Sequence, residues 1–221
     1  MTSTPVPLRP TRHNPAPLIL AMAAFAALLT TTAPPVIAQS FDPGDESCSG
    51  KPEGTACWME LANHPQCYLW NPGLALGASA TWAAECTDGL AQGMGTITWT
   101  FEGDKVQFEN GLLMGGQRSG RWIKLRSEDS SGTALFYSAG PYVNGREYGR
   151  WVLRFPDGQT EEGPFVEGKR HGQWVIRYGS GNTGEGPYVD GTVHGRWVYR
   201  DNDGNSCAVE FVRGEQQGEC K

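Results

Sequence analysis

The chain has 221 residues, of which 18 are basic and 24 are acidic, so its formal net charge at pH 7 is −6. Hydrophobic residues make up 38% of the sequence, enough to supply a sizeable core. The acidic balance excludes proteins that bind nucleic acid through net positive charge.

Residues 1–38 have the three parts of a secretory signal peptide. Arg9 and Arg12 precede an apolar run over residues 18–29, and Val36 and Ala38 occupy the −3 and −1 positions of a small-residue cleavage site. A retained membrane anchor is the alternative, but this run is shorter than the ~20 residues that span a bilayer. Cleavage after Ala38 leaves 183 residues with a net charge of −8. We therefore expect a periplasmic or secreted protein.

All six cysteines follow the predicted cleavage site. An even number of cysteines in an exported chain predicts three disulfides, although six cysteines can pair in about 15 ways. A zinc site is the alternative, but the sequence contains no CxxC pair. Proximity along the chain favours three local disulfides, Cys48–Cys57, Cys67–Cys86 and Cys207–Cys220.

A repeat of 23 residues occupies the C-terminal part of the chain. GPYVNGREYGRWVLRFPDGQT begins at Gly140, GPFVEGKRHGQWVIRYGSGNT at Gly163, and GPYVDGTVHGRWVYRDNDGNS at Gly186. The units 140–162, 163–185 and 186–208 align without a gap, and EFVRGEQQGECK continues them in degraded form. Residues 89–99 and 116–122 carry the same glycine spacing less regularly.

Each unit predicts a short strand and a longer strand, because side chains alternate along GRWVLRF and glycines bracket the connection between them. A single hairpin cannot bury its apolar face, so neighbouring units must stack. We predict an all-β fold, an elongated antiparallel sheet of stacked β-hairpins over residues 86–221 with a disulfide-containing N-terminal cap over residues 39–85. The predicted core consists of two columns, one of Tyr142, Phe165, Tyr188 and Phe211 and one of Trp122, Trp151, Trp174 and Trp197. An exposed aromatic groove is the alternative for some of these residues.

The segment DNDGN, residues 201–205, has the acid and glycine content of a calcium-binding loop. It falls in the same column as FPDGQ and YGSGN, however, and these segments share turn-forming residues rather than carboxylates. A connecting turn is therefore the preferred interpretation. His171 and His194 share another column, but equivalent atoms of stacked hairpins lie about 10 Å apart, too far to bind one metal ion together.

The columns GxYxxGxxHGxW, with YVDG, FVEG and the later turn glycine, resemble the MORN repeat, and more closely its bacterial variant with NGKxHGxW units. The similarity is strong over residues 140–221, weaker over 86–122 and absent before about residue 65. The resemblance implies a β-hairpin array that serves as an interaction or scaffolding surface, with protein or lipid partners, and it implies no catalytic residue. Trp151, Trp174 and Trp197 replace the second glycine of the classical GxG, so the lipid-binding properties of eukaryotic members are not carried over.

These features predict a non-enzymatic, exported protein of a bacterial cell envelope whose repeat sheet binds a protein or another envelope component. No GxSxG or HExxH motif is present, and paired cysteines offer no thiolate nucleophile, so we expect no catalytic residue, cofactor or metal ion. The candidate binding face is the polar side of the longer strands: Arg154, Arg177 and Arg200 with Val152, Val175 and Val198. A row of arginines suits carboxylates or sulfates of a partner.

Several alternatives remain at this point. The arginines could instead pair with Glu161, Glu162 or Glu185 of neighbouring strands and only solvate the sheet. A glycan hydrolase could use Glu161 or Glu162 with Glu185, which requires carboxyl groups about 5–9 Å apart. Exposed tryptophans could associate with a membrane surface, and the sheet could bind cell-wall glycan. An open sheet edge could pair with a second copy of the chain.

Overall fold

The computed structural model describes residues 40–101, 106–127 and 135–220. The chain divides into two units, Met1–Ile37 and Ala38–Lys221. The predicted signal peptide, residues 1–38, lies outside the described residues, as do residues 128–134, which precede the regular repeats.

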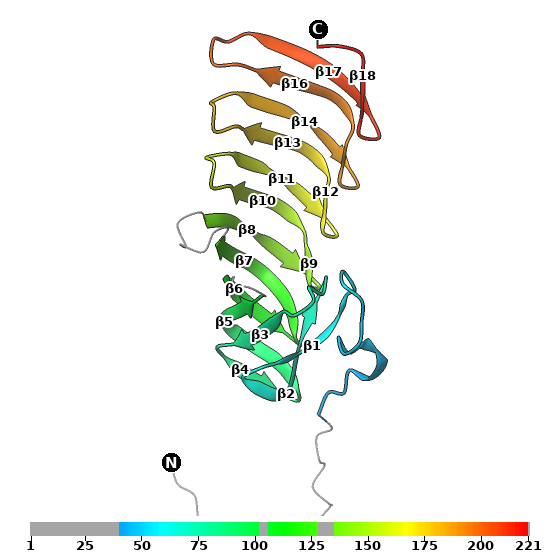
Figure 1. Ribbon diagram of the computed structural model, residues 1–221, viewed down its shortest axis with the longest axis vertical. Coiled ribbons are helices and arrows are strands. Elements are labelled where there is room, and N and C mark those ends of the chain that lie inside the picture. The colour runs from blue at the N-terminus through cyan, green and yellow to red at the C-terminus, as the bar shows by residue number, and fades with distance from the viewer. Residues whose placement is uncertain (1–39, 102–105, 128–134, 221) are drawn as a thin grey trace, which may run out of the picture. The chain divides into compact units, whose positions relative to one another are not determined.

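The second unit is almost entirely β-structure and forms one long open sheet of 18 strands (Figure 1). No α-helix occurs within the described ranges, and the one helical turn is the 3-10 helix η1 (Gly44–Glu46). These observations confirm the predicted all-β fold of stacked hairpins. The strands of the N-terminal part are β1 (Cys57–Leu61), β2 (His64–Asn71), β3 (Ser79–Trp82), β4 (Glu85–Thr87), β5 (Leu90–Thr100), β6 (Val106–Met114), β7 (Gln117–Ser127) and β8 (Leu135–Val143). Those of the C-terminal part are β9 (Arg146–Glu147), β10 (Gly149–Arg154), β11 (Thr160–Val166), β12 (Lys169–Arg170), β13 (Gly172–Arg177), β14 (Thr183–Val189), β15 (Thr192–Val193), β16 (Gly195–Arg200), β17 (Ser206–Val212) and β18 (Glu215–Gln217).

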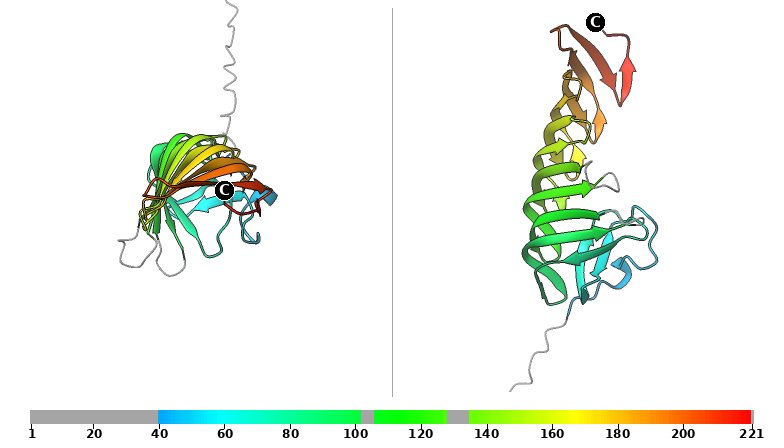
Figure 2. Two further views of the ribbon diagram at one scale, coloured as in Figure 1. Left: turned by 90° about the horizontal axis from the view of Figure 1, so that it is seen from above. Right: turned by 60° about the vertical axis from the view of Figure 1, so that its left-hand side comes forward.

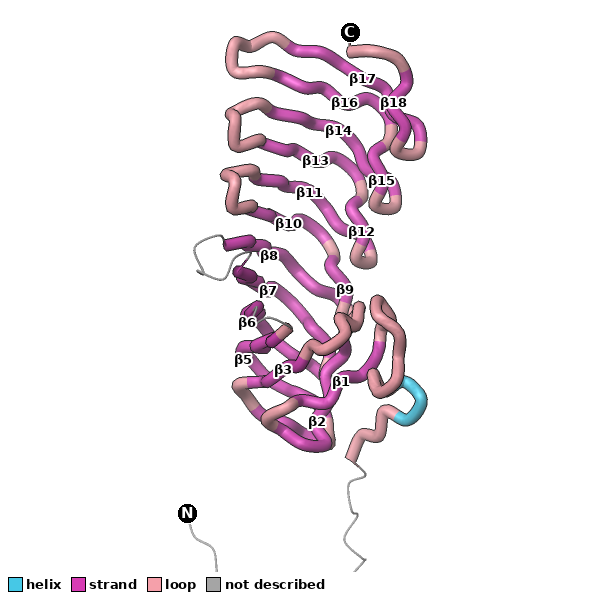
Figure 3. Tube along the Cα trace, viewed as in Figure 1, coloured by secondary structure: helices cyan, strands magenta, loops and turns pink. Residues whose placement is uncertain are grey.

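From β5 onward, each long strand pairs antiparallel with the next one along the chain, in the order β5, β6, β7, β8, β10, β11, β13, β14, β16 and β17. The short strands β9, β12, β15 and β18 extend the hairpins at one side of the stack (Figure 3). A single parallel pair, Tyr68 with Leu90, joins β2 to β5 and makes the sheet mixed rather than purely antiparallel. An isolated bridge between Ser47 and Trp58 is also parallel, so these two contacts are the departures from the predicted strand orientation among the pairs of the described chain.

The first strand of each repeat is longer than the sequence pattern indicated. β11 and β14 begin at Thr160 and Thr183, three residues before the repeat starts at Gly163 and Gly186. These added residues pair on both sides; Thr160, for example, lies opposite Arg154 of β10 and Arg177 of β13. Strand pairing with two neighbours therefore extends β structure over residues whose own pattern is polar.

The hairpin tips are two-residue turns in which both residues have positive φ. In Asn144–Gly145, Glu167–Gly168, Asp190–Gly191 and Arg213–Gly214 the first residue has φ of 49–51° and the glycine 75–88°. This is the type I′ geometry, whose twist matches that of the flanking antiparallel strands. The glycine is needed because a side chain at this φ would be strained.

Side chains alternate between two faces of the sheet, which we call the inner and outer faces. The inner face carries Trp122, Trp151, Trp174 and Trp197, all of which are buried. Each indole lies directly over a glycine of the preceding strand, Trp174 over Gly163 for example, where an added Cβ would overlap the ring. The last three indole N–H groups donate to the carbonyl of the proline that follows this glycine, at 3.0–3.1 Å. The Gly-Pro pair of each repeat therefore forms the surface on which the tryptophan ring packs and to which its N–H bonds.

The second predicted column fills the spaces between these indoles. Tyr142 is buried, whereas Phe165, Tyr188 and Phe211 are half-buried and pack against the core. From Tyr142 to Trp197 the two columns alternate in edge-to-face contacts with ring centroids 5.3–5.8 Å apart. Such contacts add ~0.5–1.5 kcal/mol each to area burial. Stacking of repeats thus builds one continuous aromatic core.

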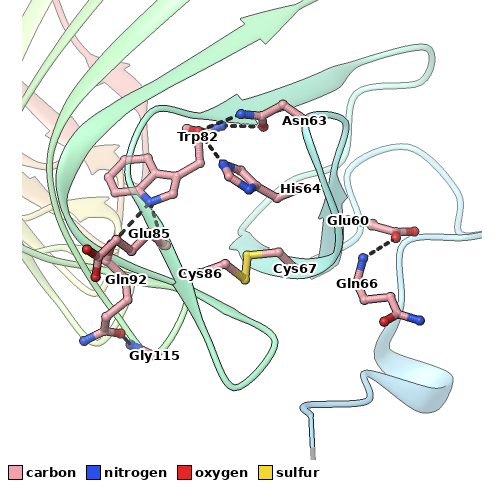
Figure 4. The surroundings of a disulfide bond; sticks show 10 residues. All are labelled: Glu60, Asn63, His64, Gln66, Cys67, Trp82, Glu85, Cys86, Gln92 and Gly115. Carbon is pink, nitrogen blue, oxygen red and sulfur yellow. Dashed lines mark hydrogen bonds between the residues drawn. A yellow bond between two sulfur atoms is a disulfide. The ribbon is translucent and has the colours of Figure 1, made fainter.

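The cysteine-rich segment, with β1 to β4, lies against the inner side of the curved sheet at its N-terminal end (Figure 2). Two disulfides, Cys48–Cys57 and Cys67–Cys86, tie it together. The buried ring of Trp82 anchors it, because the indole N–H donates to the carbonyls of Glu85 and Gln92 (Figure 4). Asn63 completes this anchor by hydrogen bonding both the N–H and the carbonyl of Trp82. β4 spans the predicted cap boundary at residue 85.

At the other end, the third disulfide joins Cys207 of β17 to Cys220. All three pairs are those favoured by proximity along the chain. Disulfides of this kind persist in oxidising compartments, so they are consistent with an exported protein.

Candidate binding face

The predicted binding residues lie together on the outer face of β10 to β17. Cross-strand pairing places the three arginines in one row, in which each is separated from the next by a threonine. Arginines two strands apart are about 10 Å apart along the stack. We call this the arginine row: Tyr137, Arg154, Thr160, Arg177, Thr183, Arg200 and Ser206.

The three arginines are exposed but have different neighbours. Arg154 lies over the ring of Tyr137, with its guanidinium carbon 5.4 Å from the ring centroid. Arg200 forms an ion pair with Glu185 at 2.7 Å, and both side chains are about half exposed. Arg177 has no ion pair within 4 Å in the described part of the chain, although its charge contributes to the lowered pKa of Glu162. The row therefore offers guanidinium groups that are only partly engaged.

A second row runs beside the first and contains the three predicted valines. Val152, Val175 and Val198 are half-buried, and Glu162 and Glu185 lie between them. Glu162 is paired with Arg150 at 2.6 Å, and this hydrogen bond, ahead of any other cause, lowers the pKa of its carboxyl. The outer face thus carries two neighbouring rows. One contains valines and partly neutralised glutamates, and the other is the arginine row.

Among the described residues, the alternative in which each arginine pairs with a neighbouring acid is correct for Arg200 alone. Glu162 is engaged by Arg150, a residue that the sequence pattern did not single out. Glu161 lies on the inner face, where it is buried and paired with Arg170. A catalytic pair of Glu161 with Glu185 is therefore wrong, because alternation along a strand puts these two carboxylates on opposite faces of the sheet. Glu162 and Glu185 share a face but are two strands, about 10 Å, apart.

The sequence analysis missed a column of charged residues on the inner face. Arg118, Glu147 and Arg170 stand four residues before Trp122, Trp151 and Trp174, and the uncharged Val193 takes this position before Trp197. The first three form ion pairs with residues of the preceding strands: Arg118 with Glu109 at 2.7 Å, Glu147 with Lys124 at 3.0 Å, and Arg170 with Glu161. The repeat alignment contained this signal, because the sign of the charge alternates in a single column.

The first of these pairs is fully enclosed, with 3% and 4% of the side chains of Arg118 and Glu109 exposed. Burial alone would raise the pKa of Glu109, but the charge and hydrogen bond of Arg118 outweigh it and hold that pKa below its ordinary value. The guanidinium also lies 5.5–5.9 Å from the ring centroids of Trp99, Trp122 and Tyr142. Arg118 therefore connects the ion pair to the aromatic core.

The segment DNDGN is a connecting turn between β16 and β17. The carboxylate of Asp201 accepts a hydrogen bond from the Asn205 side chain, which is the main cause of its lowered pKa, and further ones from the backbone N–H groups of Asp203 and Asn205. His194 accepts a hydrogen bond from the N–H of Arg213, and His171 faces Asp190 at 3.7 Å, both on exposed loops. Within the described ranges, no group of three or more His, Cys, Asp or Glu residues could hold a metal ion.

In the part of the chain that the structure describes, no helix is long and apolar enough to cross a membrane. No protein-family model matches the chain, and no curated protein matches it significantly.

Proposed function

We propose that this chain is a non-enzymatic, exported cell-envelope protein whose MORN-like repeat sheet is a protein-interaction or scaffolding surface. The observation that supports it most is the arginine row, which concentrates basic groups on one face of an acidic chain. The arginine row lies on the outer face of β10 to β17, whereas the inner face of these strands carries the two aromatic columns.

The chemistry of the row favours a partner with carboxylates at regular intervals. A guanidinium donates two parallel hydrogen bonds to one carboxylate, and such pairs are roughly twice as strong as neutral hydrogen bonds. The hydroxyls of Thr160 and Thr183 lie between the arginines and can donate or accept. An acidic protein strand or segment fits this alternation of charged and hydroxyl groups.

The experiment is a pulldown with residues 39–221, oxidised and immobilised, from detergent-solubilised envelope proteins and wall fragments. The test variant carries Arg154→Ala, Arg177→Ala and Arg200→Ala. A matched control removes three exposed basic residues at hairpin tips, Arg146, Lys169 and Arg213, which changes the net charge equally.

We expect a specific protein partner that binds the native chain and the control but not the test variant, and binding that weakens with added salt. Thermal unfolding of the test variant should change little, because exposed charge pairs contribute only ~0–1 kcal/mol each. An equal loss of partner binding in the test variant and the control would show that net charge alone accounts for the interaction. Capture of wall fragments instead of protein would favour the alternative of a glycan-binding module.

A further inference from the structure

A cavity lies on the inner face, where the loop that follows β2 closes over the sheet. Its volume is about 210 Å³, and it is lined by residues of this loop, such as Asn71 and Ala75, and by side chains of β5 to β8. Sites for drug-sized ligands usually measure ~300–1,000 Å³, so this one suits a smaller molecule. It is separate from the arginine row, which faces the opposite side of the sheet.

One wall of the cavity is aromatic. Trp99 and Phe101, two residues apart on and just beyond β5, are stacked with ring centroids 6.4 Å apart and planes at 18°. Trp99 is 4% exposed. Because Trp99 is almost completely buried and Phe101 is half-buried, Phe101 presents most of the accessible aromatic surface of this wall to a ligand.

The other walls carry polar groups with hydrogen-bonding capacity to spare. Lys124 donates one hydrogen bond, to Glu147, which leaves two N–H donors. The Gln107 side chain donates to Glu109 and keeps its carbonyl oxygen as an acceptor. Asn71 accepts from the N–H of Gly73 and keeps its amide donors. The cavity thus presents both donors and acceptors.

The charges around the cavity are balanced. Arg118 is neutralised by Glu109, and Lys124 by Glu147, which lies next to the lining. A neutral ligand therefore leaves these ion pairs intact, whereas a carboxylate would be repelled by Glu109 while it is attracted by the two cations.

Trp99 also has an unmet hydrogen bond. The buried indoles of Trp122, Trp151, Trp174 and Trp197 each donate to a backbone carbonyl. By contrast, Nε1 of Trp99 is closed off from solvent and has no acceptor among the described atoms. A buried donor without a partner costs about 1–3 kcal/mol, and because this N–H is closed off from solvent, a ligand supplies its acceptor only when the Trp99 side chain shifts.

We propose that this cavity binds one neutral sugar ring. The C–H face of the sugar packs on Phe101, next to Trp99, and its hydroxyls, which both donate and accept, bond to Asn71, Gln107 and Lys124. This inference goes beyond the proposed protein-binding function and does not depend on it.

The test follows the indole N–H resonances of the ¹⁵N-tryptophan-labelled protein during titration with D-glucose, N-acetyl-D-glucosamine and benzoate. The Trp99→Phe variant assigns the Trp99 resonance. We expect at least one sugar to shift this resonance saturably, with a dissociation constant on the order of 1–10 mM, as befits about a dozen ligand atoms. The Trp197 resonance, which belongs to the last repeat, should not move.

Filling the cavity separates this site from nonspecific binding. Ala75→Phe should weaken sugar binding about tenfold or more. Leu76→Phe changes the neighbouring residue of the same loop, which is 60% exposed and does not line the cavity, and should leave binding unchanged. The variant without the three arginines should bind sugar normally, so failure of one proposal is distinguishable from failure of the other. Absence of any saturable sugar shift, or a shift with benzoate alone, would overturn the inference.

Discussion

The packing of each tryptophan ring on a glycine of the preceding strand is the feature of the repeat that can be tested most quantitatively. In Gly163→Ala, the new methyl group would come closer to the indole of Trp174 than the 3.0 Å that real Cβ atoms observe. Trp174 is completely buried between Phe165 and Tyr188, so its ring cannot move away without disturbing both neighbours.

The expected cost follows from these contacts. Forcing an extra methyl into a packed core costs ~1–3 kcal/mol. Displacement of the ring also weakens the indole hydrogen bond to the Pro164 carbonyl, which is worth ~0.5–1.5 kcal/mol. Alanine restricts the unfolded chain more than glycine does, which stabilises the folded state by ~0.4–1 kcal/mol. We expect Gly163→Ala to lower the free energy of unfolding by about 2–3 kcal/mol.

Denaturant unfolding of the oxidised protein, followed by circular dichroism, measures this change. Gly73→Ala is the control, because a Cβ at Gly73 meets nothing within 4 Å and its φ is ordinary. If the ring causes the cost, Gly163→Ala should cost less than about 1 kcal/mol when Trp174 is already leucine. An equal cost in both backgrounds would show that the glycine is required for another reason, and the reasoning would fail.

Three further predictions concern charges and turns. Arg118→Met should lower the free energy of unfolding by about 3–5 kcal/mol in thermal or denaturant melts, because it leaves the carboxylate of Glu109 buried without its partner. Because the pKa of Glu109 is lowered in the folded state, its contribution to stability is present above its ordinary pKa of 4.5. That contribution should be lost as the pH falls through the folded-state value, and an acid titration of the melting temperature that stays flat there would contradict this. Glu167→Asn should raise the free energy of unfolding by about 0.5–1 kcal/mol, and with it the melting temperature, because asparagine tolerates the positive φ of this turn better than glutamate does. An unchanged melting temperature would argue against the turn as a source of strain.

The periodic features of this protein could be read from its sequence. The spacing of 23 residues predicted the stacked hairpins, the alternation along GRWVLRF predicted which side chains share a face, and the turn glycines predicted the hairpin tips. These features are local, and each recurs in several copies, so sequence alone sufficed. The three disulfides followed in the same way, because each joins cysteines no more than 19 residues apart.

What the tertiary structure decided depends on register between strands. A shift of one residue in strand register would move Glu161 to the other face of the sheet and would change the partner of Glu162 from Arg150 to another residue. Composition does not determine this register. The cavity is also a tertiary feature, because Asn71 and Lys124 meet there only when an irregular loop folds over the repeat sheet. Repetition determines the sheet from sequence, whereas contacts between a nonrepeating segment and the sheet arise only when the whole chain has folded.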